Sequence, residues 1–260
     1  MKKIKKAKPK TKKVIVIRSK GFPKGEPKKM VKAVKKVLKV LGVKASVKIE
    51  TPIHDTDYWL NRPEDDKHLD WDYSENWIDG YWESWKHPHR DLILEALKEF
   101  EPFDLLEVGC NVGPNLNCIK QKYGGIRLAG IDIDPRVIEI AKDKLRDIDF
   151  QVAGATKLPY DTQSFSILLY DAVLMYLNKD EVKLAFDEIE RVVRKGVIIV
   201  DRFDESLEGI RNGNVRAYNY PKLLENRGFR VKSIKITKKD WPKSVGWDKC
   251  GYVWIATKVI

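Results

Sequence analysis

The sequence of 260 residues has little cysteine and methionine, and it contains no long hydrophobic run. Its three cysteines, Cys110, Cys118 and Cys250, are too few and too scattered for a disulfide framework, and no C-x-x-C pair with zinc spacing occurs. No apolar run approaches the roughly 18–20 residues that cross a bilayer, and no apolar segment of a secretory signal follows the basic N-terminus. The sequence therefore predicts a cytoplasmic protein with no transmembrane segment, no disulfide framework and no metal centre.

Positive charge is concentrated at the N-terminus of the chain. Residues 1–50 contain 19 Lys and Arg against two Asp and Glu, whereas the rest of the chain contains 31 against 36. A basic head on a mildly acidic body predicts a polyanion partner, such as RNA or a membrane surface. A solubilising tail explains the same pattern, so the role of residues 1–50 stays open at this point.

Composition and periodicity divide the chain into four parts. Residues 1–13 are rich in lysine and almost free of apolar residues, which predicts a disordered basic tail. Residues 14–50 hold two β-rich runs around an apolar stripe at helical spacing, which predicts a small basic β-α-β extension. Residues 51–100 combine an aromatic-rich segment with a leading helix. Such aromatics suit a lid over a cleft, although simple packing on the main domain is the alternative. Residues 101–260 are expected to form that main domain.

The main domain alternates strands and helices, which is the pattern of a parallel α/β sheet. Strands are expected at 104–108, 127–132, 148–152, 165–170 and 197–201, and helices near 114–122, 135–145, 180–194 and 220–227. Two further β-rich runs end the chain without a helix between them, which predicts an antiparallel hairpin. The predicted fold is a Rossmann-like α/β domain with a seven-stranded, mostly parallel sheet.

A glycine turn after the first of these strands is the most informative stretch. Gly109 and Gly113 follow an apolar run that contains Glu107, and a helical segment comes next. Glycines let a turn approach a ligand closely, and the exposed N–H groups of the helix favour electron-rich atoms. The next strand ends in Asp132, and a carboxylate at this place binds ribose hydroxyls in nucleotide-binding α/β folds. A dinucleotide fingerprint, however, requires a glycine where Asn111 stands.

Five landmarks in chain order resemble the motifs of class I S-adenosylmethionine-dependent methyltransferases. They are Glu107-Val108-Gly109-x-x-x-Gly113, Gly130-Ile131-Asp132, Leu158-Pro159-Tyr160-Asp161 with Ser164-Phe165-Ser166, the stretch Tyr170-Asp171-Ala172-Val173-Leu174-Met175-Tyr176-Leu177, and Arg191-Val192-Val193-Arg194-Lys195-Gly196. The segment His87-Pro88-His89-Arg90 and the Trp241…Trp247 tail are similar to a bacterial subgroup of stand-alone methyltransferases. The resemblance covers roughly residues 80–260.

The resemblance implies S-adenosylmethionine as the cofactor and a set of residues that bind it. The implied set is Glu107, Gly109, Asn111, Gly113, Asp132, Ile133, Gly154, Ala155 and Asp171. In this family the glycines admit the amino-acid end of the cofactor, the glutamate orients its amine, and the aspartate after the second strand takes the ribose. Gly154 stands where the family usually has an aspartate that meets adenine. Adenine recognition then falls to backbone groups near Ala155 or to Asp161.

Methyl transfer from a sulfonium is an in-line displacement, so the protein mainly aligns the nucleophile. A base is needed only if the nucleophile must lose a proton, and the candidates are Asp171, His87, His89 and Tyr176. The His87-x-His89 pair lacks a third metal ligand at suitable spacing. Neither a D/N-P-P-Y/F signature nor a Pro-Cys pair occurs.

These observations predict methyl transfer to a small or medium-sized acceptor, such as a metabolite or a sugar- or lipid-like compound. Two alternatives remain. One is an RNA methyltransferase that holds phosphates with residues 1–50, and the other is a non-catalytic binding or assembly protein with the same fold.

Overall fold

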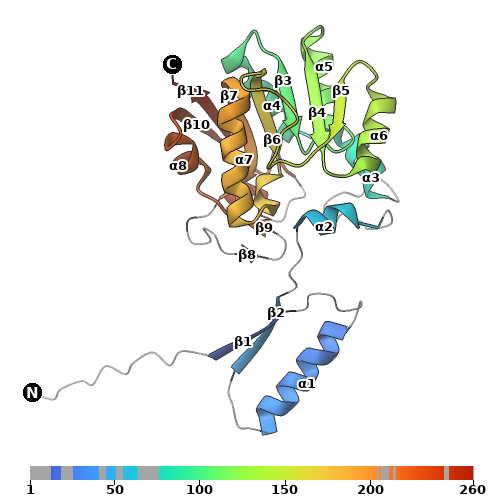
Figure 1. Cartoon of the computed structure of the whole chain (residues 1–260), viewed down its shortest axis with the longest axis vertical. Helices are drawn as coiled ribbons and strands as arrows, with labels where there is room; N and C mark the ends of the chain where they lie inside the picture. Colours follow the sequence, from blue (N-terminus) through green and yellow to red (C-terminus); the bar gives the residue numbers. More distant parts are fainter. Residues whose placement is uncertain are drawn as a thin grey trace, which may run out of the picture. The chain divides into compact units, whose positions relative to one another are not determined.

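The structure is a computed structural model that divides into two compact units, residues 1–54 and 55–260 (Figure 1). It describes residues 13–18, 26–40, 45–50, 55–63, 76–203, 205, 211–212, 215–242 and 246–259. Residues 1–12 of the predicted basic tail lie outside the described ranges, whereas Lys13 begins the first strand.

The N-terminal unit is a β-α-β crossover. Strand β1 (Lys13–Arg18) pairs in parallel with β2 (Ala45–Glu50), and helix α1 (Glu26–Val40) connects them. Val34 and Leu38, one helical turn apart, are the half-buried side chains among the described residues of α1, which is the pattern of a helix packed along one stripe. Four lysines are exposed on the same helix: Lys32, Lys35, Lys36 and Lys39.

The second unit is built on a seven-stranded sheet with the order β10-β11-β7-β6-β3-β4-β5. Its strands are β3 (Leu105–Val108), β4 (Leu128–Asp132), β5 (Asp149–Val152), β6 (Phe165–Asp171), β7 (Val193–Arg202), β10 (Phe229–Lys235) and β11 (Gly251–Lys258). The five strands from β3 to β7 are parallel, while β11 runs antiparallel to both β7 and β10. This arrangement confirms the predicted Rossmann-like sheet with its C-terminal antiparallel strands. A short pair, β8 (Arg211–Asn212) and β9 (Val215–Arg216), lies outside the sheet.

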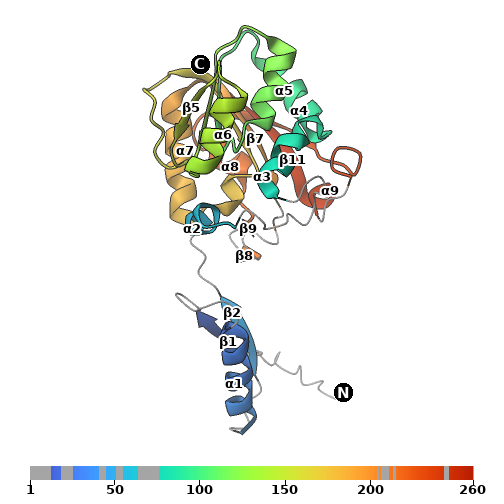
Figure 2. The same ribbon diagram turned by 90° about the vertical axis from the view of Figure 1, so that its right-hand side faces the viewer.

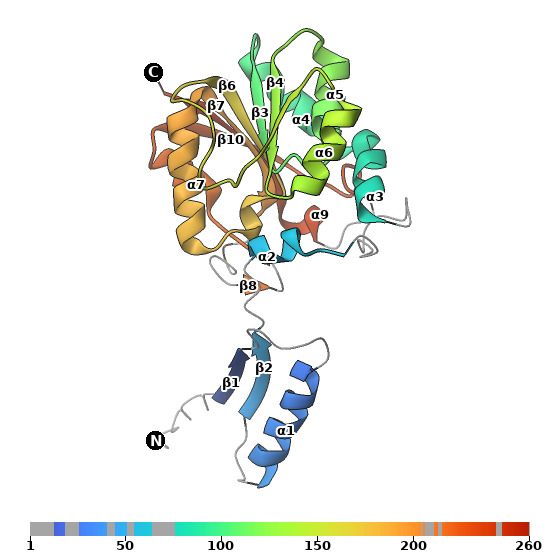
Figure 3. The ribbon, with the colours of Figure 1, turned by 45° about the vertical axis from the view of Figure 1, so that its right-hand side comes forward.

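Helices cover both faces of the sheet (Figures 1 and 3). They are α4 (His89–Leu97), α5 (Pro114–Tyr123), α6 (Pro135–Lys144) and α7 (Lys179–Val192), together with the short α8 (Tyr220–Glu225). Apolar residues of α4, α5 and α6 share one core cluster, and those of α7 and α8 share the other. Other short elements are α2 (Asp55–Leu60), α3 (Trp77–Glu83), α9 (Trp247–Cys250) and the 3-10 helices η1 (Ser84–Lys86), η2 (Lys98–Phe100) and η3 (Leu174–Tyr176). Figure 2 shows α9 near the start of β11.

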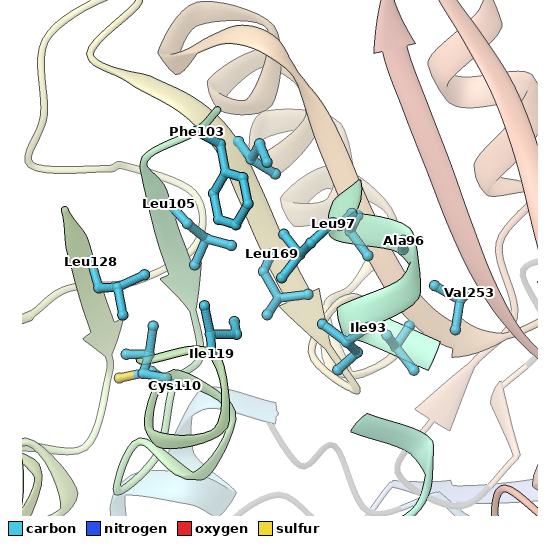
Figure 4. Close-up of a cluster of buried hydrophobic side chains, with 14 of the residues drawn as sticks. Ile93, Ala96, Leu97, Phe103, Leu105, Cys110, Ile119, Leu128, Leu169 and Val253 are labelled. Carbon is cyan, nitrogen blue, oxygen red and sulfur yellow. The ribbon is translucent and has the colours of Figure 1, made fainter. Parts of the chain in front are cut away.

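Successive strand residues alternate between the two cores, as the pleat requires. Leu105 and Leu169 point into the cluster beneath α4 and α5, where Figure 4 shows them beside Ile93 and Ile119. Leu106 enters the opposite cluster beneath α7. Because both faces are covered, the central strands are apolar throughout, which explains why they were recognisable as continuous runs.

Strand β7 begins earlier than predicted. The sequence led us to expect a helix near 180–194 and a strand at 197–201, but α7 ends at Val192 and β7 starts at Val193. The segment Arg191–Gly196 lacks the proline and the second glycine that would interrupt strand pairing. Gly196 itself lies so close to β11 that a Cβ there would stand 2.0 Å from the carbonyl oxygen of Ala256. The glycine therefore serves close strand packing.

Candidate active site

The carboxyl ends of β3, β4 and β6 surround a cavity of about 1210 Å³, including its open mouth. Ligands of open α/β sheets bind at this edge, where the strand order reverses. In this sheet the reversal lies between β3 and β6, which are neighbours although β4 and β5 separate them in the chain. The cavity is lined entirely by residues of the second unit.

The turn after β3 has the backbone conformation that its glycines predict. Gly109 has φ +75°, Asn111 has φ +50° and Gly113 has φ +82°. The amide of Gly109 donates to the carbonyl of Ile131 at 2.7 Å, which fixes the turn against β4. A Cβ on Gly109 would lie 2.4 Å from Val173, so a side chain does not fit there. Gly109 and Asn111 line the cavity.

Gly113 is not among the lining residues of the cavity. It precedes α5 directly, and a Cβ there would lie 2.9 Å from Leu145. Gly113 therefore shapes the turn without lining the cavity, whereas the resemblance had implied that it binds the cofactor.

Asp132 closes β4 and lines the cavity together with Ile133. One carboxylate oxygen accepts from the amide of Asn111 at 2.9 Å, and the other accepts from the amide of Asp134 at 3.0 Å. Each oxygen retains a further lone pair for a ligand. Burial raises the pKa of Asp132 to about 6, so the carboxylate form prevails at neutral pH.

The adenine position predicted from the sequence lies at the β5 side of the cavity. Gly154 and Ala155 line it, and a Cβ on Gly154 would meet only Ile133, at 4.0 Å. Asp161, the other candidate for adenine recognition, is exposed and does not line the cavity. Of the two candidates for adenine recognition, only the backbone near Ala155 lies at the cavity.

A buried polar cluster lies between β3 and β6. The amide nitrogen of Asn115 donates to Glu107 at 2.7 Å and to Asp171 at 2.9 Å. Burial raises the pKa of Glu107 well above its usual value, and Glu107 lies behind the cavity wall. Four buried atoms here lack a hydrogen-bond partner among the described residues. They are Glu107 Oε2, Asn115 Oδ1, Asp171 Oδ1 and Arg90 Nε.

Sequence reasoning missed Arg90 and Asn115. The Arg90 side chain is buried, donates to the carbonyl of Ser84 at 2.5 Å and lines the cavity. Asn115 is a buried polar residue in the first turn of α5. Arg90 ends the His87-Pro88-His89-Arg90 segment, and Asn115 lies two residues after Gly113. A polar residue on the buried side of a helix was the available signal.

The two histidines and Asp171 form a chain of hydrogen bonds. His89 Nε2 lies 3.0 Å from Asp171 Oδ2, and the Nδ1 atoms of His87 and His89 are 2.6 Å apart. Burial lowers the pKa of His89 and brings the pKa of His87 to about 3, so both rings are neutral at pH 7. A neutral His89 that donates from Nε2 to Asp171 accepts at Nδ1, so we assign the shared proton to His87.

Asp171 and His89 line the cavity, whereas His87 lies behind His89. Burial alone would raise the pKa of Asp171, but His89, Arg90 and the donor of Asn115 outweigh burial and hold it below its usual range. Tyr176, the fourth candidate, also lines the cavity. Burial raises the pKa of Tyr176, so its hydroxyl is neutral.

Six aromatic residues line the cavity: Trp59, Trp77, Tyr81, Tyr176, Trp241 and Trp247. Trp241 stacks on Trp247, with ring centroids 4.2 Å apart and planes 2° from parallel, and on His89, with centroids 4.4 Å apart. Trp59 meets Tyr176 edge to face at 5.1 Å. From the aromatic-rich segment, Trp82 and Trp85 do not line the cavity, and Trp71 and Tyr73 lie outside the described residues.

Arg136 holds the segment that carries Trp59. Its guanidinium pairs with Asp134 at 2.6 Å and donates to the carbonyls of Arg62 at 3.0 Å and Trp59 at 3.3 Å. Figures 1 and 3 place α2 and α3 at the same end of the sheet. Asp134 also caps α6, so the end of β4 and the cover over the cavity are linked through one salt bridge.

Two negative observations concern the described ranges. Within them, no three His, Cys, Asp or Glu side chains gather in a way that would hold a metal ion. No helix in the same ranges combines the length and apolar character needed to cross a bilayer.

In a comparison with protein families, residues 106–200 match the family described as methyltransferase domain. Among curated proteins, the ubiquinone/menaquinone biosynthesis C-methyltransferase UbiE of Campylobacter jejuni is 24% identical over 147 residues, which cover 54% of this chain and 62% of that protein. The matched segments span between 14% and 62% of the length of the curated relatives.

Solved structures show the same fold. Magnesium protoporphyrin IX methyltransferase of Synechocystis with bound S-adenosylmethionine has a TM-score of 0.57 at 14% identity, over 79% of this chain and 97% of that one. A chain from the complex of the Haloferax volcanii methyltransferase activator Trm112 with a methyltransferase has a TM-score of 0.56 at 17% identity, over 71% and 95%. Residues 106–200 therefore match a methyltransferase domain, and the solved structures show that the chain shares the fold of such domains.

Proposed function

We propose that this protein transfers a methyl group from S-adenosylmethionine to a small or medium-sized acceptor. The observation that carries the proposal is the position of complementary groups around one cavity. Asp132 lies on the β4 side, the glycine turn lies in the middle, and the polar cluster with Arg90 lies on the β6 side. This order matches a ligand with a ribose in its middle and an amino acid at one end.

The unpartnered atoms of the polar cluster suit the amino-acid end of the cofactor. An ammonium group needs acceptors, and Asp171 Oδ1, in the cavity wall, is a buried acceptor without a partner among the described residues. Glu107 Oε2 and Asn115 Oδ1, also without a partner there, lie behind that wall. A carboxylate needs a donor, and Arg90 Nε, in the cavity wall, is a buried donor without a partner among the described residues. Because an unpaired buried polar group costs free energy, a zwitterionic ligand supplies what these side chains lack.

The remaining contacts follow from the strand ends. Asp132 accepts the ribose hydroxyls, and Ile133 with the backbone of Gly154 and Ala155 lies along adenine. When bound, S-adenosylmethionine supplies an activated methyl group on a sulfonium. The protein's part is then to align the acceptor and to exclude water. Asp171 lies between the amino-acid end and the aromatic walls, where it can take a proton from an acceptor that must lose one.

Calorimetric titration of the full chain with S-adenosylmethionine tests the proposal. We expect saturable 1:1 binding, and we expect Arg90→Lys to weaken it about tenfold, since a single lysine donor replaces the arginine fork. Exposed Arg146, changed to Lys, serves as the control. Absence of binding at millimolar cofactor would refute the proposal, and binding without methyl transfer to any acceptor would favour the non-catalytic alternative.

One observation favours the RNA alternative: four lysines are exposed on α1, namely Lys32, Lys35, Lys36 and Lys39. If they hold phosphates, changing all four to glutamine should remove salt-sensitive RNA binding and methyl transfer together. Our proposal expects methyl transfer to a small acceptor to be unchanged in this variant.

A further inference from the structure

The cavity has two halves of different chemistry. The cofactor half lies beside β4 and β5 and contains Asp132, Ile133 and Gly154. The acceptor half lies beside β6 and β7 and is lined by Met175, Tyr176, Trp241 and Trp247, with Trp59 against Tyr176. Because β4 and β6 lie on opposite sides of β3, a cofactor that spans β4 to β3 directs its reactive end towards the acceptor half.

We infer that the methyl acceptor is a planar aromatic compound that carries a hydroxyl group, that is, a phenol-type acceptor. This inference rests on the proposed methyl transfer and names its substrate class. The shape of the cavity walls, their polarity and the single carboxylate that faces them support this substrate class.

The walls of the acceptor half are held in fixed planes. Trp241 is fixed by its stacks on Trp247 and His89, and Trp247 is also approached by the guanidinium of Arg202, 5.5 Å from its ring centroid. Tyr176 is fixed by the edge of Trp59. Rigid aromatic surfaces favour a flat ring, which they can meet by stacking or edge to face. They offer less to a flexible alkyl chain, which would lose conformational entropy on binding.

The walls of the acceptor half combine aromatic and apolar surface with a small set of polar groups. Among the described residues these are the hydroxyls of Tyr81 and Tyr176, the indole N–H groups, His89, Arg90 and the Asp171 carboxylate, while other lining side chains include Met175 and Leu177. His89 already bonds to Asp171, and Arg90 already donates to Ser84. A sugar would leave most of its hydroxyls unpaired here. A ring with one hydroxyl needs only one acceptor, and Asp171 is the anionic acceptor, since His89 beside it is neutral.

The groups present in the cavity account for each bond and proton of the methyl transfer. The acceptor oxygen forms a bond to the methyl carbon as the bond from that carbon to sulfur breaks. The hydroxyl proton passes to the carboxylate of Asp171. The products are the aryl methyl ether, S-adenosylhomocysteine and a protonated Asp171, which later releases its proton to water. His89 and Asn115 hold the carboxylate in position with bonds of 3.0 Å and 2.9 Å, and they act as positioning residues.

The test uses the full chain saturated with S-adenosylhomocysteine, whose binding is measured first by calorimetry. Two probes of equal skeleton follow, 2-naphthol and its saturated analogue decahydro-2-naphthol. We expect 2-naphthol to bind at least tenfold more tightly. If S-adenosylhomocysteine does not bind, the proposed function itself fails. If it binds but the two probes bind equally, only the phenol-type acceptor is refuted.

Substitutions in the cavity wall test which side chains produce the preference for 2-naphthol. Trp241→Leu and, independently, Tyr176→Leu should reduce the preference for 2-naphthol to less than threefold while S-adenosylhomocysteine binding shows that the chain is folded. Trp85→Leu is the matched control, because Trp85 is half-buried but does not line the cavity. An unchanged preference in both cavity variants would overturn the assignment. Tighter binding of uridine than of 2-naphthol would also overturn it and would favour a nucleobase acceptor.

The role of Asp171 has its own readout. Phenols ionise near pH 10, and a phenolate is repelled by a carboxylate. Binding of 2-naphthol should therefore weaken at least threefold as the pH rises through its pKa in the wild type. In Asp171→Asn this loss should become smaller, because the repulsion is removed while the cost of burying a phenolate remains. The unfolding temperature checks that the variant is folded. Binding of 2-naphthol that responds to pH in the same way in both proteins would refute contact between the hydroxyl and Asp171. The same titration in His89→Asn tests positioning, for which we expect a smaller loss than in the wild type.

Discussion

The two halves of the cavity are lined by different kinds of chemical group. The cofactor half uses backbone amides, a glycine turn and the carboxylate of Asp132, all within a short stretch of chain after β3 and β4. The acceptor half uses aromatic side chains from segments far apart, since Trp59 precedes the sheet and Trp241 follows β10. The cofactor half thus depends on local backbone conformation, whereas the acceptor half depends on the tertiary fold.

The largest expected effect concerns the glycine turn. Gly109→Ala should abolish cofactor binding, with a loss above about 100-fold, because its Cβ would collide with Val173 at 2.4 Å in a left-handed conformation. Gly228→Ala is the matched control. It has nearly the same φ of +78°, but no atom lies within 4 Å of its Cβ position. Calorimetry would contradict this account if both variants bound the cofactor equally well.

The next effect concerns the ribose contact. Asp132→Ala should weaken cofactor binding roughly 10- to 150-fold, because hydrogen bonds to a charged group contribute about 1.5–3 kcal/mol. Asp143→Ala, at an exposed surface pair, should leave affinity unchanged. Wild-type affinity in Asp132→Ala would remove the carboxylate from the site.

The same carboxylate predicts a pH dependence. Its pKa of about 6 means that it is ionised above pH 6 and becomes protonated below. The ionised form accepts ribose hydroxyls better, so cofactor affinity should be level between pH 7 and 8 and fall up to about tenfold per unit below pH 6. Asp132→Asn should remove this dependence. An equal fall in the variant would assign the titration to another group.

The smallest expected effect concerns the segment that carries Trp59 and Arg62. Arg136→Ala removes two hydrogen bonds to the carbonyls of Trp59 and Arg62, together with the pair to Asp134. Cofactor should then dissociate about three- to tenfold faster, since each bond contributes about 1 kcal/mol. Arg146→Ala, at a fully exposed position, is the control. Stopped-flow displacement measures the rate of cofactor dissociation in both variants. Equal rates in the two variants would mean that this segment does not retain the cofactor.

The same contrast explains what the sequence could predict. The strands around Leu105 and Leu168 are continuous apolar runs, and the glycine turn and Asp132 lie at fixed offsets from them, so the fold and the cofactor half followed from local pattern. Arg90 and Asn115 were missed because their importance arises only when α4 and α5 bring them to Glu107 and Asp171. The stack of His89 on Trp241 joins residues 152 positions apart in the chain, and no local pattern encodes it.

The most direct test of the central claim is the position of the transferred methyl group. Met175 lines the acceptor half and is the one methionine of the second unit, because the other two are Met1 and Met30. In a methionine-labelled sample its methyl signal is the one from the second unit, beside those of Met1 and Met30. With S-adenosylmethionine labelled in its methyl carbon, we predict an intermolecular nuclear Overhauser effect to Met175 and to the Trp241 ring, and none to Ile133. An effect to Ile133 without one to Met175 would contradict the division of the cavity into cofactor and acceptor halves.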